Sequence, residues 1–504
     1  MTTPAAQIEV QDVAALVREQ LPPLAGVRPA GRIEISRPTT AIGSSRLGIG
    51  FETLDRRMFT AEPVYPHLSR LGAKWARVQT GWSRCETEPG RYDFTWLDDI
   101  VDGLAAAGVS TMFSVTFGNE LYMPGVPHES AVGYVPLYYD GAVAAWTAYV
   151  EALAAHYRGR VTCWEVWNEP DIPQFWQPAA VSGRDYAELV RITTGAVRAG
   201  IPDATIVGGA TSLADPAFLV DALRAGLADS IDAFSFHPYQ MVPEHNLQNM
   251  HDLLRRLLDE HSPHRRIALY QGENGCPSQL SGHHDDWLGM YSMDQVVQAK
   301  WIARRFLADL KVGFDRIFYF HAVDLIERPY RQAGDKVNAP VMMGLIHGGS
   351  YEPKYSFDVA RRVCHLFDER TRRTELMCLF TEPDPATPQR STLLAAPHVA
   401  TFERGGAPLF VYWLAEDPQQ RARQATIDVE LWWDDRLTLR RPVLLDLLTG
   451  EVYCIDPPAD PTGVPDRTDW RTRGVRYSLP LTDYPVVLTD ASVVEELDGS
   501  WRYR

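Results

Sequence analysis

Residues 143–170 read VAAWTAYVEALAAHYRGRVTCWEVWNEP, and this stretch contains the pattern that decides the fold. Apolar side chains in residues 143–157 recur three and four positions apart, which is typical of an amphipathic helix. Residues 161–167 then form a short run rich in β-branched and aromatic residues, which predicts a strand. A helix followed directly by a buried strand is the repeating unit of folds built on a parallel sheet.

The same alternation extends outward from this unit, from about residue 45 to residue 367. It predicts eight strands, at Leu47–Phe51, Lys74–Gln79, Val109–Thr116, Val161–Trp167, Thr205–Gly209, Ile231–His237, Ile267–Gln271 and Arg316–His321. Eight strand–helix units is the number that closes a (β/α)8 TIM barrel. The alternative is an open, doubly wound sheet, but it favours a glycine-rich phosphate turn after its first strand, and residues 48–53 form no such turn. We therefore expect the α/β class, with a barrel over residues 45–370.

The pattern changes after residue 370. Short strand-like runs between residues 376 and 489 are separated by clusters of Asp, Pro and Gly, without a helical pattern. This predicts an antiparallel β-sandwich over residues 371–504. Residues 1–44 contain a helical pattern at Val10–Gln20 and a strand candidate at Arg32–Ser36, which we expect to join the sandwich.

Composition narrows the classes of partner. The chain has 504 residues, with 49 Lys and Arg against 65 Asp and Glu, a formal net charge of −16. This balance disfavours a nucleic acid or an anionic membrane as a partner, because both need a basic surface. The sequence contains neither an apolar run long enough to span a bilayer nor a secretory signal, so we expect a cytoplasmic protein. The six cysteines lack zinc-site spacing and are expected to be reduced. The oligomeric state stays open, a homo-oligomer included.

Two predicted strand ends carry a glutamate. Glu169 follows the fourth strand and Glu273 follows the seventh. A buried carboxylate is costly unless it is paired or functional. In a barrel of eight strands these two strands face each other across roughly 14 Å, which leaves about 6 Å between the two carboxyl groups. Retaining glycosidases need about 5–5.5 Å and inverting ones about 6.5–9.5 Å, so the estimate favours retention without deciding it.

These motifs resemble a known family. Trp167-Asn-Glu-Pro170 and Gln271-Gly-Glu-Asn274 resemble the two catalytic signatures of clan A retaining glycoside hydrolases. The segments 92–99 (YDFTWLDD) and 344–356, together with the C-terminal sandwich, resemble the family 39 group of β-xylosidases and α-L-iduronidases most. The resemblance implies that Glu169 is the general acid/base and Glu273 the nucleophile. It also implies supporting or sugar-binding roles for Arg77, Asn168, His237 and Tyr239, with Asn168 at the sugar 2-hydroxyl.

Further substrate-binding candidates lie in the loops after the predicted strands. They are Asn119 and Glu120, the aromatic residues Trp82, Phe175, Trp176, Trp287 and Tyr291, and His321. His321 ends the eighth strand, where many clan A members have a tryptophan. The run Gly282-His-His-Asp-Asp-Trp287 suggests a metal site, but adjacent ligands rarely converge on one ion, and we favour substrate recognition. We expect no metal and no cofactor, since the mechanism needs neither.

The sequence thus favours a retaining exo-glycosidase that cleaves a terminal bond of an oligosaccharide or glycoside by double displacement. Long loops at residues 119–140 and 276–291 favour a pocket over an open cleft. Two alternatives stay open: a transglycosidase that uses the same glutamates, and a non-catalytic carbohydrate-binding barrel. The sugar is also open among xylose, arabinofuranose, galactose, galactofuranose and a uronic acid.

Overall fold

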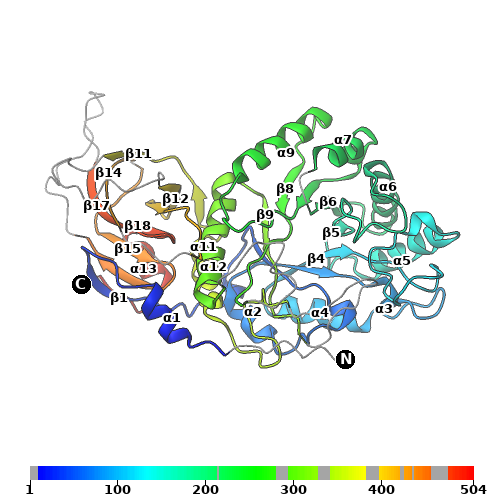
Figure 1. Cartoon of the computed structure of the whole chain (residues 1–504), viewed down its shortest axis with the longest axis horizontal. Coiled ribbons are helices and arrows are strands. Elements are labelled where there is room, and N and C mark those ends of the chain that lie inside the picture. Colours follow the sequence, from blue (N-terminus) through cyan, green and yellow to red (C-terminus); the bar gives the residue numbers. More distant parts are fainter. Residues whose placement is uncertain are drawn as a thin grey trace.

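The structure is a computed structural model that describes residues 10–212, 215–279, 293–326, 341–381, 397–419, 425–433, 436–455 and 475–503. Figure 1 shows a barrel with surrounding helices and, beside it, a smaller body made of strands. Strand β1 (Arg28–Arg32) pairs within this smaller body, and the N-terminal helix α1 (Val13–Gln20) contacts helix α11 (Gln295–Val312).

Eight parallel strands form a closed barrel in chain order, which confirms the predicted TIM barrel. They are β2 (Leu47–Gly50), β3 (Trp75–Gln79), β4 (Ser110–Val115), β5 (Cys163–Val166), β6 (Thr205–Thr211), β7 (Ala233–Phe236), β8 (Ala268–Gln271) and β9 (Arg316–Tyr319). Six buried side chains, one from each strand from β4 to β9, form an interior cluster of their own: Met112, Cys163, Val207, Ala233, Tyr270 and Phe318. The barrel is therefore filled by side chains beneath its carboxyl end.

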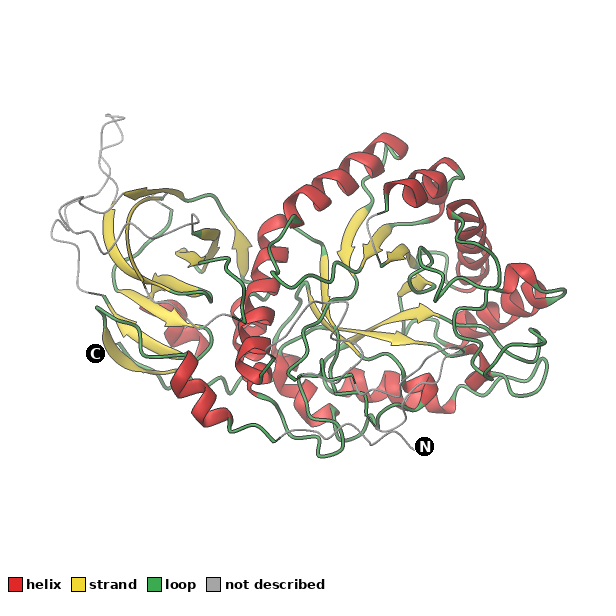
Figure 2. Ribbon diagram, viewed as in Figure 1, coloured by secondary structure: helices red, strands yellow, loops and turns green. Residues whose placement is uncertain are grey.

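Helices surround the barrel, as Figure 2 shows. They are α2 (Tyr65–Leu71), α3 (Trp82–Cys85), α4 (Thr95–Ala106), α5 (Ala142–His156), α6 (Gly183–Gly200), α7 (Pro216–Arg224), α8 (Leu227–Ser230), α9 (Leu247–His261), α11 (Gln295–Val312) and α12 (Tyr355–Leu366). Their apolar faces pack on the strands in one continuous core. This packing follows from amphipathic stretches such as residues 143–157, which bury one side against the sheet.

The smaller body contains two antiparallel sheets, which confirms the predicted β-sandwich. One has seven strands in the order β1-β16-β15-β18-β13-β12-β10, and the other has three in the order β11-β14-β17. Their bounds are β10 (Thr371–Arg373), β11 (Met377–Thr381), β12 (His398–Arg404), β13 (Ala407–Trp413), β14 (Ala425–Trp432), β15 (Pro442–Asp446), β16 (Glu451–Cys454), β17 (Val475–Leu481) and β18 (Val486–Asp490).

Two elements differ from the prediction. The N-terminal strand is β1 at Arg28–Arg32, ahead of the expected Arg32–Ser36, and it pairs with β16 at a sheet edge. An edge tolerates Pro29, which lacks an N–H, and the ladder shifts register between Pro29 and Gly31. The sandwich region also contains a helix, α13 (Ala491–Leu497), where none was expected. The Asp490 side chain caps it, and Val493, Val494 and Leu497 are buried.

Helices α11 and α12 lie between the barrel and the sandwich (Figure 1). Nearly every residue of α11 is buried, because the barrel covers one side of the helix and the sandwich the other. Two cations of α11 are paired inside this contact. Lys300 lies 2.8 Å from Asp483 of the sandwich, and Arg304 lies 2.7 Å from Glu244 of the barrel. Glu244 also accepts a hydrogen bond from the Trp413 indole of the sandwich at 2.7 Å.

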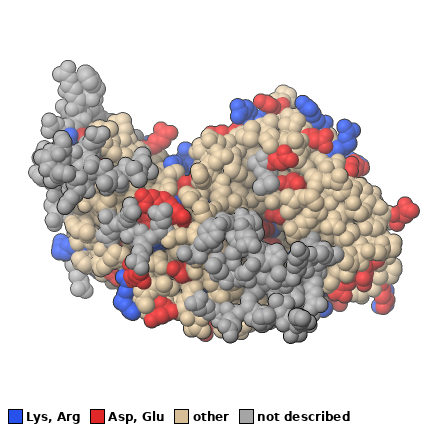
Figure 3. Space-filling model, in the orientation of Figure 1, with Lys and Arg blue, Asp and Glu red and all other residues tan. Residues whose placement is uncertain are grey.

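The six cysteines are unpaired in the structure, and all except the half-buried Cys378 are buried. Acidic and basic side chains are interspersed over the part of the surface described in Figure 3. Within the described residues, every helix is too short or too polar to cross a lipid bilayer.

Candidate active site

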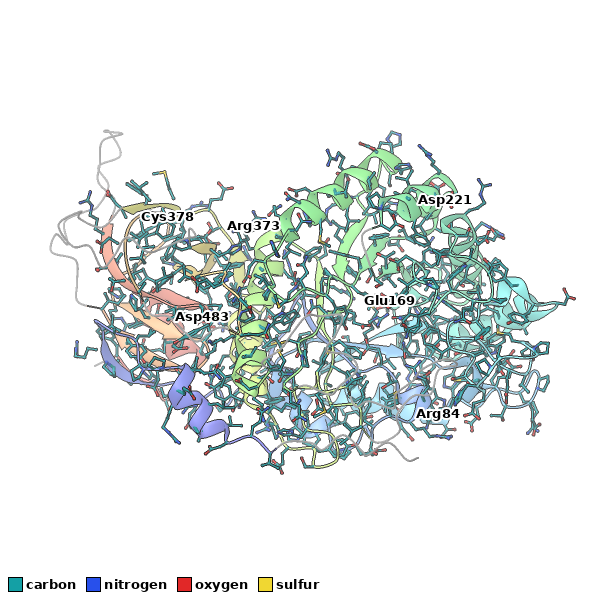
Figure 4. All side chains as sticks on the ribbon, in the orientation of Figure 1. Arg84, Glu169, Asp221, Arg373, Cys378 and Asp483 are labelled. Carbon is teal, nitrogen blue, oxygen red and sulfur yellow. The ribbon has the colours of Figure 1, made fainter. Side chains whose placement is uncertain are left out.

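Polar side chains from five barrel strands meet at the carboxyl end of the barrel. This is the end at which βα-loops carry the active sites of TIM-barrel enzymes. The side chains come from β2, β3, β5, β7, β8 and the segments that follow them: Glu52, Arg77, Glu165, Asn168, Glu169, His237, Tyr239 and Glu273. Figure 4 places Glu169 near the centre of the barrel.

Glu169 and Glu273 approach each other across this end. Glu169 lies three residues beyond β5, and Glu273 lies two residues beyond β8. A carboxylate oxygen of each lies within 4.8 Å of one of the other. Their side chains are 12% and 14% exposed, whereas those of Arg77, Glu165 and His237 are fully buried. The two glutamates are thus the carboxylates of this cluster that an incoming molecule can reach.

Each oxygen of Glu273 accepts a hydrogen bond. The Arg77 guanidinium donates to Oε2 at 2.8 Å, and the Tyr239 hydroxyl donates to Oε1 at 2.7 Å. Burial, together with the charge of Glu273, raises the pKa of Tyr239 well above its ordinary value, so the phenol keeps its proton and remains a donor. Donors of this kind stabilise the ionised form of a carboxyl group. The arrangement suits a carboxylate that carries a negative charge at neutral pH.

Glu169 has a different environment. Burial raises its pKa to about 7, although the nearby Arg77 charge opposes that shift. Its side chain is hydrogen-bonded to His237, whose Nδ1 lies 2.9 Å from Oε1. Burial lowers the pKa of His237, so the ring is neutral, and its tautomer decides whether Nδ1 accepts a hydrogen bond from Glu169 or donates one to it. Glu169 is therefore suited to hold a proton near neutral pH and to release it.

The backbone around Glu169 adopts an unusual conformation. Trp167 has φ of 71° and Glu169 has φ of 47°, a region that non-glycine residues rarely occupy. The Glu169 N–H donates to the carbonyl of Ala210 at 2.7 Å, which ties this turn to the end of β6. Such conformations cost about 1–3 kcal/mol each and concentrate at functional sites. The strained turn aims Glu169 across the barrel.

Arg77 connects the cluster. Besides Glu273 it pairs with Glu52 at 2.9 Å and with Glu165 at 2.6 Å, and it donates to Oδ1 of Asn168 at 2.9 Å. Four carboxyl groups surround this one cation, those of Glu52, Glu165, Glu169 and Glu273. A single positive charge cannot neutralise all four in a buried space. Burial, with a further contribution from the Glu273 charge, raises the pKa of Glu52 to about 8 despite Arg77. Glu52 and Glu169 are therefore the carboxyl groups of this cluster whose pKa values favour the protonated form near neutral pH.

Sequence reasoning missed Glu52 and Glu165. Glu52 stands two residues beyond β2, which is the same strand-end signal that pointed to Glu169 and Glu273. Glu165 lies inside β5, and a charged residue within a buried strand was also visible in the sequence. Both glutamates accept hydrogen bonds from Arg77, at 2.9 Å and 2.6 Å, and so hold it in place.

The other predicted residues lie in three kinds of place. The ring of His321 is buried, with Nδ1 2.9 Å from the Val323 carbonyl and Nε2 3.5 Å from Oε2 of Glu52. Asn119 is buried and joins its loop to the segment after α3, since it donates to the Glu86 carbonyl and accepts from the Leu121 N–H. Glu120 is exposed. Trp287, Tyr291 and the run 282–287 lie outside the described residues.

Two of the expected sugar-stacking aromatic residues are core residues instead. Trp176 is fully buried, donates its indole N–H to the Tyr138 hydroxyl at 3.1 Å and packs edge-to-face on Trp167. Trp82 is also fully buried and stacks on Tyr122. Both rings belong to the hydrophobic core, where burial removes their large apolar surface from water. The expected contact of Trp176 with substrate is therefore wrong.

Among the described residues, one group of three could hold a metal ion by its geometry, namely Glu169, His237 and Glu273. The oxygen Oε2 of Glu273 already pairs with the Arg77 guanidinium at 2.8 Å. A divalent cation bound to that oxygen would be repelled by the buried positive charge of Arg77. The donor set therefore fits a proton-transferring pair better than it fits a metal.

Comparison with known proteins adds to this geometry. Residues 81–244 match the model of glycosyl hydrolases family 39. A β-xylosidase of Geobacillus stearothermophilus is 27% identical over 227 residues, which cover 38% of this chain and 43% of that protein. The chain thus matches less than half the length of this curated relative.

Two solved structures share the fold. A family 39 glycoside hydrolase from Bacteroides cellulosilyticus WH2 has a TM-score of 0.61 and 18% identity, over 90% of this chain and 81% of that one. A family 39 β-xylosidase from Caulobacter crescentus has a TM-score of 0.55 and 18% identity, over 92% of this chain and 97% of that one. These two enzymes share with this chain the fold of a (β/α)8 barrel and a sandwich. The comparisons support a family 39 glycoside hydrolase.

Proposed function

We propose that this chain is a retaining exo-glycosidase in which Glu273 is the nucleophile and Glu169 the general acid/base. The observation that carries the proposal is the approach of the two carboxylates to within 4.8 Å, in environments that favour opposite protonation states. Retaining enzymes need such a short separation, whereas inverting enzymes keep about 6.5–9.5 Å for a water molecule between the two groups.

The first step forms a covalent intermediate. An oxygen of Glu273 attacks the anomeric carbon while the proton of Glu169 passes to the glycosidic oxygen. The bond between that oxygen and the anomeric carbon breaks, and the leaving group departs as an alcohol. Tyr239 and Arg77 orient Glu273 for the attack, and Asn168, itself fixed by Arg77, is the candidate donor to the sugar 2-hydroxyl.

The second step releases the sugar. Glu169, now ionised, takes a proton from water as the water oxygen attacks the anomeric carbon, and the bond to Glu273 breaks. Both carboxyl groups return to their starting states. His237 Nδ1, 2.9 Å from Glu169, accepts from the protonated carboxyl group in one neutral tautomer and donates to the ionised one in the other. A sugar alcohol in place of water at this step would give transglycosylation.

A panel of 4-nitrophenyl glycosides tests the proposal. We expect β-D-xyloside to be cleaved best, since the curated relative and one structural neighbour are named β-xylosidases. Proton NMR of the first sugar released should show the anomeric configuration of the substrate. Release of the opposite anomer first would exclude a retaining mechanism. If no glycoside of the panel were cleaved, the proposed glycosidase activity would be excluded.

The pH dependence tests the role of Glu169 separately. For an alkyl or sugar glycoside, kcat/KM should fall about tenfold per pH unit above about 7, because Glu169 must carry a proton to serve as the acid. A 2,4-dinitrophenyl glycoside is the control, since its leaving group needs no proton. The rate of the first step with this substrate, measured before steady state, should not fall as the pH rises above about 7. The same fall in rate above pH 7 with both substrates would contradict the assignment of Glu169 as the general acid.

A further inference from the structure

The segment that carries Tyr239 is held from outside the active site. It comprises residues 237–246, between β7 and α9, and the Tyr239 hydroxyl donates to Glu273 at 2.7 Å. A side chain orients a reacting group only when its own backbone is fixed, and a displacement of about 1 Å can slow a reaction by about 10²-fold. The contacts that fix this segment therefore bear on the proposed nucleophile.

Helix α11 holds the backbone on both sides of this tyrosine. The Trp301 indole donates to the carbonyl of Gln240 at 2.9 Å. Nη1 of Arg305 donates to the carbonyls of Pro238 and Pro243, at 3.3 Å and 3.1 Å. Trp301 and Arg305 are four positions apart, so they lie on the same face of the helix, and both are fully buried. The residues immediately before and after the tyrosine are thus bound to one rigid element.

The far end of the segment is bound to the sandwich. The two oxygens of Glu244 accept hydrogen bonds from Arg304 of α11, at 2.8 Å and 2.7 Å, and the Trp413 indole of β13 donates to Oε1 at 2.7 Å. The Glu244 side chain is 4% exposed. Arg304 also donates to the Glu416 carbonyl in the sandwich at 2.7 Å. Figure 1 shows α11 between the two bodies, so the segment, the helix and the sandwich meet at this carboxylate.

The Glu244 carboxylate is ionised and firmly oriented. Burial raises its pKa, but the charge and hydrogen bonds of Arg304 outweigh burial and bring the pKa below its ordinary value. An arginine that binds both oxygens of a carboxylate fixes the plane of that group as well as its distance. A buried ion pair adds little net stability compared with apolar packing. Its clearest effect here is to fix residue 244 relative to the sandwich.

We propose that the sandwich positions Tyr239 through Glu244, so that the nucleophile depends on a contact made outside the barrel. Glu244 and Trp413 are positioning residues, because they act through the tyrosine hydroxyl and its hydrogen bond to Glu273. The inference rests on the proposed role of Glu273 and goes beyond it, since it gives the sandwich a part in catalysis.

The groups that face Glu273 give this role a measurable signature. They are Glu52 after β2, Arg77 of β3, Glu169 after β5, and His237 and Tyr239 after β7. His237 is bound next to the strand, since its N–H donates to the Thr211 carbonyl at 2.8 Å. A movement of Glu244 therefore reaches Tyr239 first. A weaker Tyr239 hydrogen bond makes the ionised form of Glu273 less favourable, so the fall in kcat/KM on the acidic side should begin at a higher pH.

The test measures kcat/KM against pH for the 4-nitrophenyl glycoside that the panel shows to be cleaved best. Trp413→Phe keeps an aromatic ring and removes the indole N–H. It should lower kcat/KM about tenfold at neutral pH, as expected for a lost hydrogen bond to a charged group, and move the acidic fall upward by about one pH unit. In a Tyr239→Phe background it should change neither value further, whereas independent residues would give effects that multiply. Glu244→Gln breaks the same link and should behave likewise, which keeps the test decisive if Trp413→Phe fails to fold.

Tyr412→Phe is the matched control, at the neighbouring residue of β13. It removes a buried hydrogen bond of 3.0 Å to the Pro480 carbonyl, inside the sandwich, and should keep the wild-type profile. A wild-type profile in Trp413→Phe or Glu244→Gln, or a loss that multiplies with that of Tyr239→Phe, would overturn the inference, and the proposed function would survive both results. A wild-type enzyme that cleaves no glycoside would overturn the proposed function and the inference with it. Loss of folded protein alone cannot imitate the expected shift, because the pH at which the rate falls does not depend on the enzyme concentration.

Discussion

Replacing Glu273 by alanine is expected to reduce glycoside hydrolysis by several orders of magnitude on every substrate. The carboxylate that Arg77 and Tyr239 orient is the proposed attacking group, so its loss removes the covalent intermediate whatever the leaving group. The measurement is kcat/KM for an alkyl glycoside, a sugar glycoside and a 2,4-dinitrophenyl glycoside. All three values should fall together.

The control for this experiment is Glu88→Ala, which removes an exposed surface glutamate paired with Arg91. It should retain wild-type rates. Added azide provides a second readout, because it can occupy the space of the missing carboxylate and attack the anomeric carbon directly. From a β-glycoside, Glu273→Ala should then yield the α-glycosyl azide. A loss confined to substrates with poor leaving groups would exclude Glu273 as the nucleophile.

Replacing Glu169 by alanine is expected to give a loss that depends on the leaving group. An alkyl or sugar leaving group needs a proton in the transition state, and general acid catalysis contributes about 10²–10⁴-fold. A dinitrophenolate needs no proton, so the first step should survive on that substrate. The second step should then become limiting, because no base is left to activate water.

Azide distinguishes the two glutamates. In Glu169→Ala it needs no general base, so it should restore turnover of the dinitrophenyl glycoside and give the β-glycosyl azide. The two variants should therefore yield opposite anomers, each identified by NMR. The same anomer from both, or an equal loss on all substrates in Glu169→Ala, would require both assignments to be abandoned.

The barrel was predictable because each of its strands is a short apolar run followed by a helical pattern. That local signal repeats eight times, and the predicted strands match β2–β9 with small shifts at their ends. The N-terminal strand was placed wrongly, since β1 contains Pro29 and Gly31 and exists because β16 offers it a sheet edge. Helix α13 was missed because seven residues carry a weak periodic signal, although its capping residue Asp490 was visible.

The cluster around Glu273 was partly predictable. The strand ends pointed to both glutamates, and the family resemblance pointed to Arg77, His237 and Tyr239. The roles of Glu52 and Glu165 depend on which side chains converge inside the barrel, and a single sequence does not give that convergence. Trp176 was misjudged for the same reason, because its loop folds inward and buries the ring.

Helix α11 has a consequence for how the molecule unfolds. An outer helix of a barrel usually exposes one face to solvent, but α11 is buried on both faces. On the face that meets the sandwich, Lys300 is paired with Asp483. Separating the two bodies would uncover apolar surface and leave this buried cation without its partner, which is strongly destabilising. The change of sequence pattern near residue 370 marks the boundary between two domains, but the two domains should not unfold independently. The barrel and the sandwich are expected to unfold in a single thermal transition.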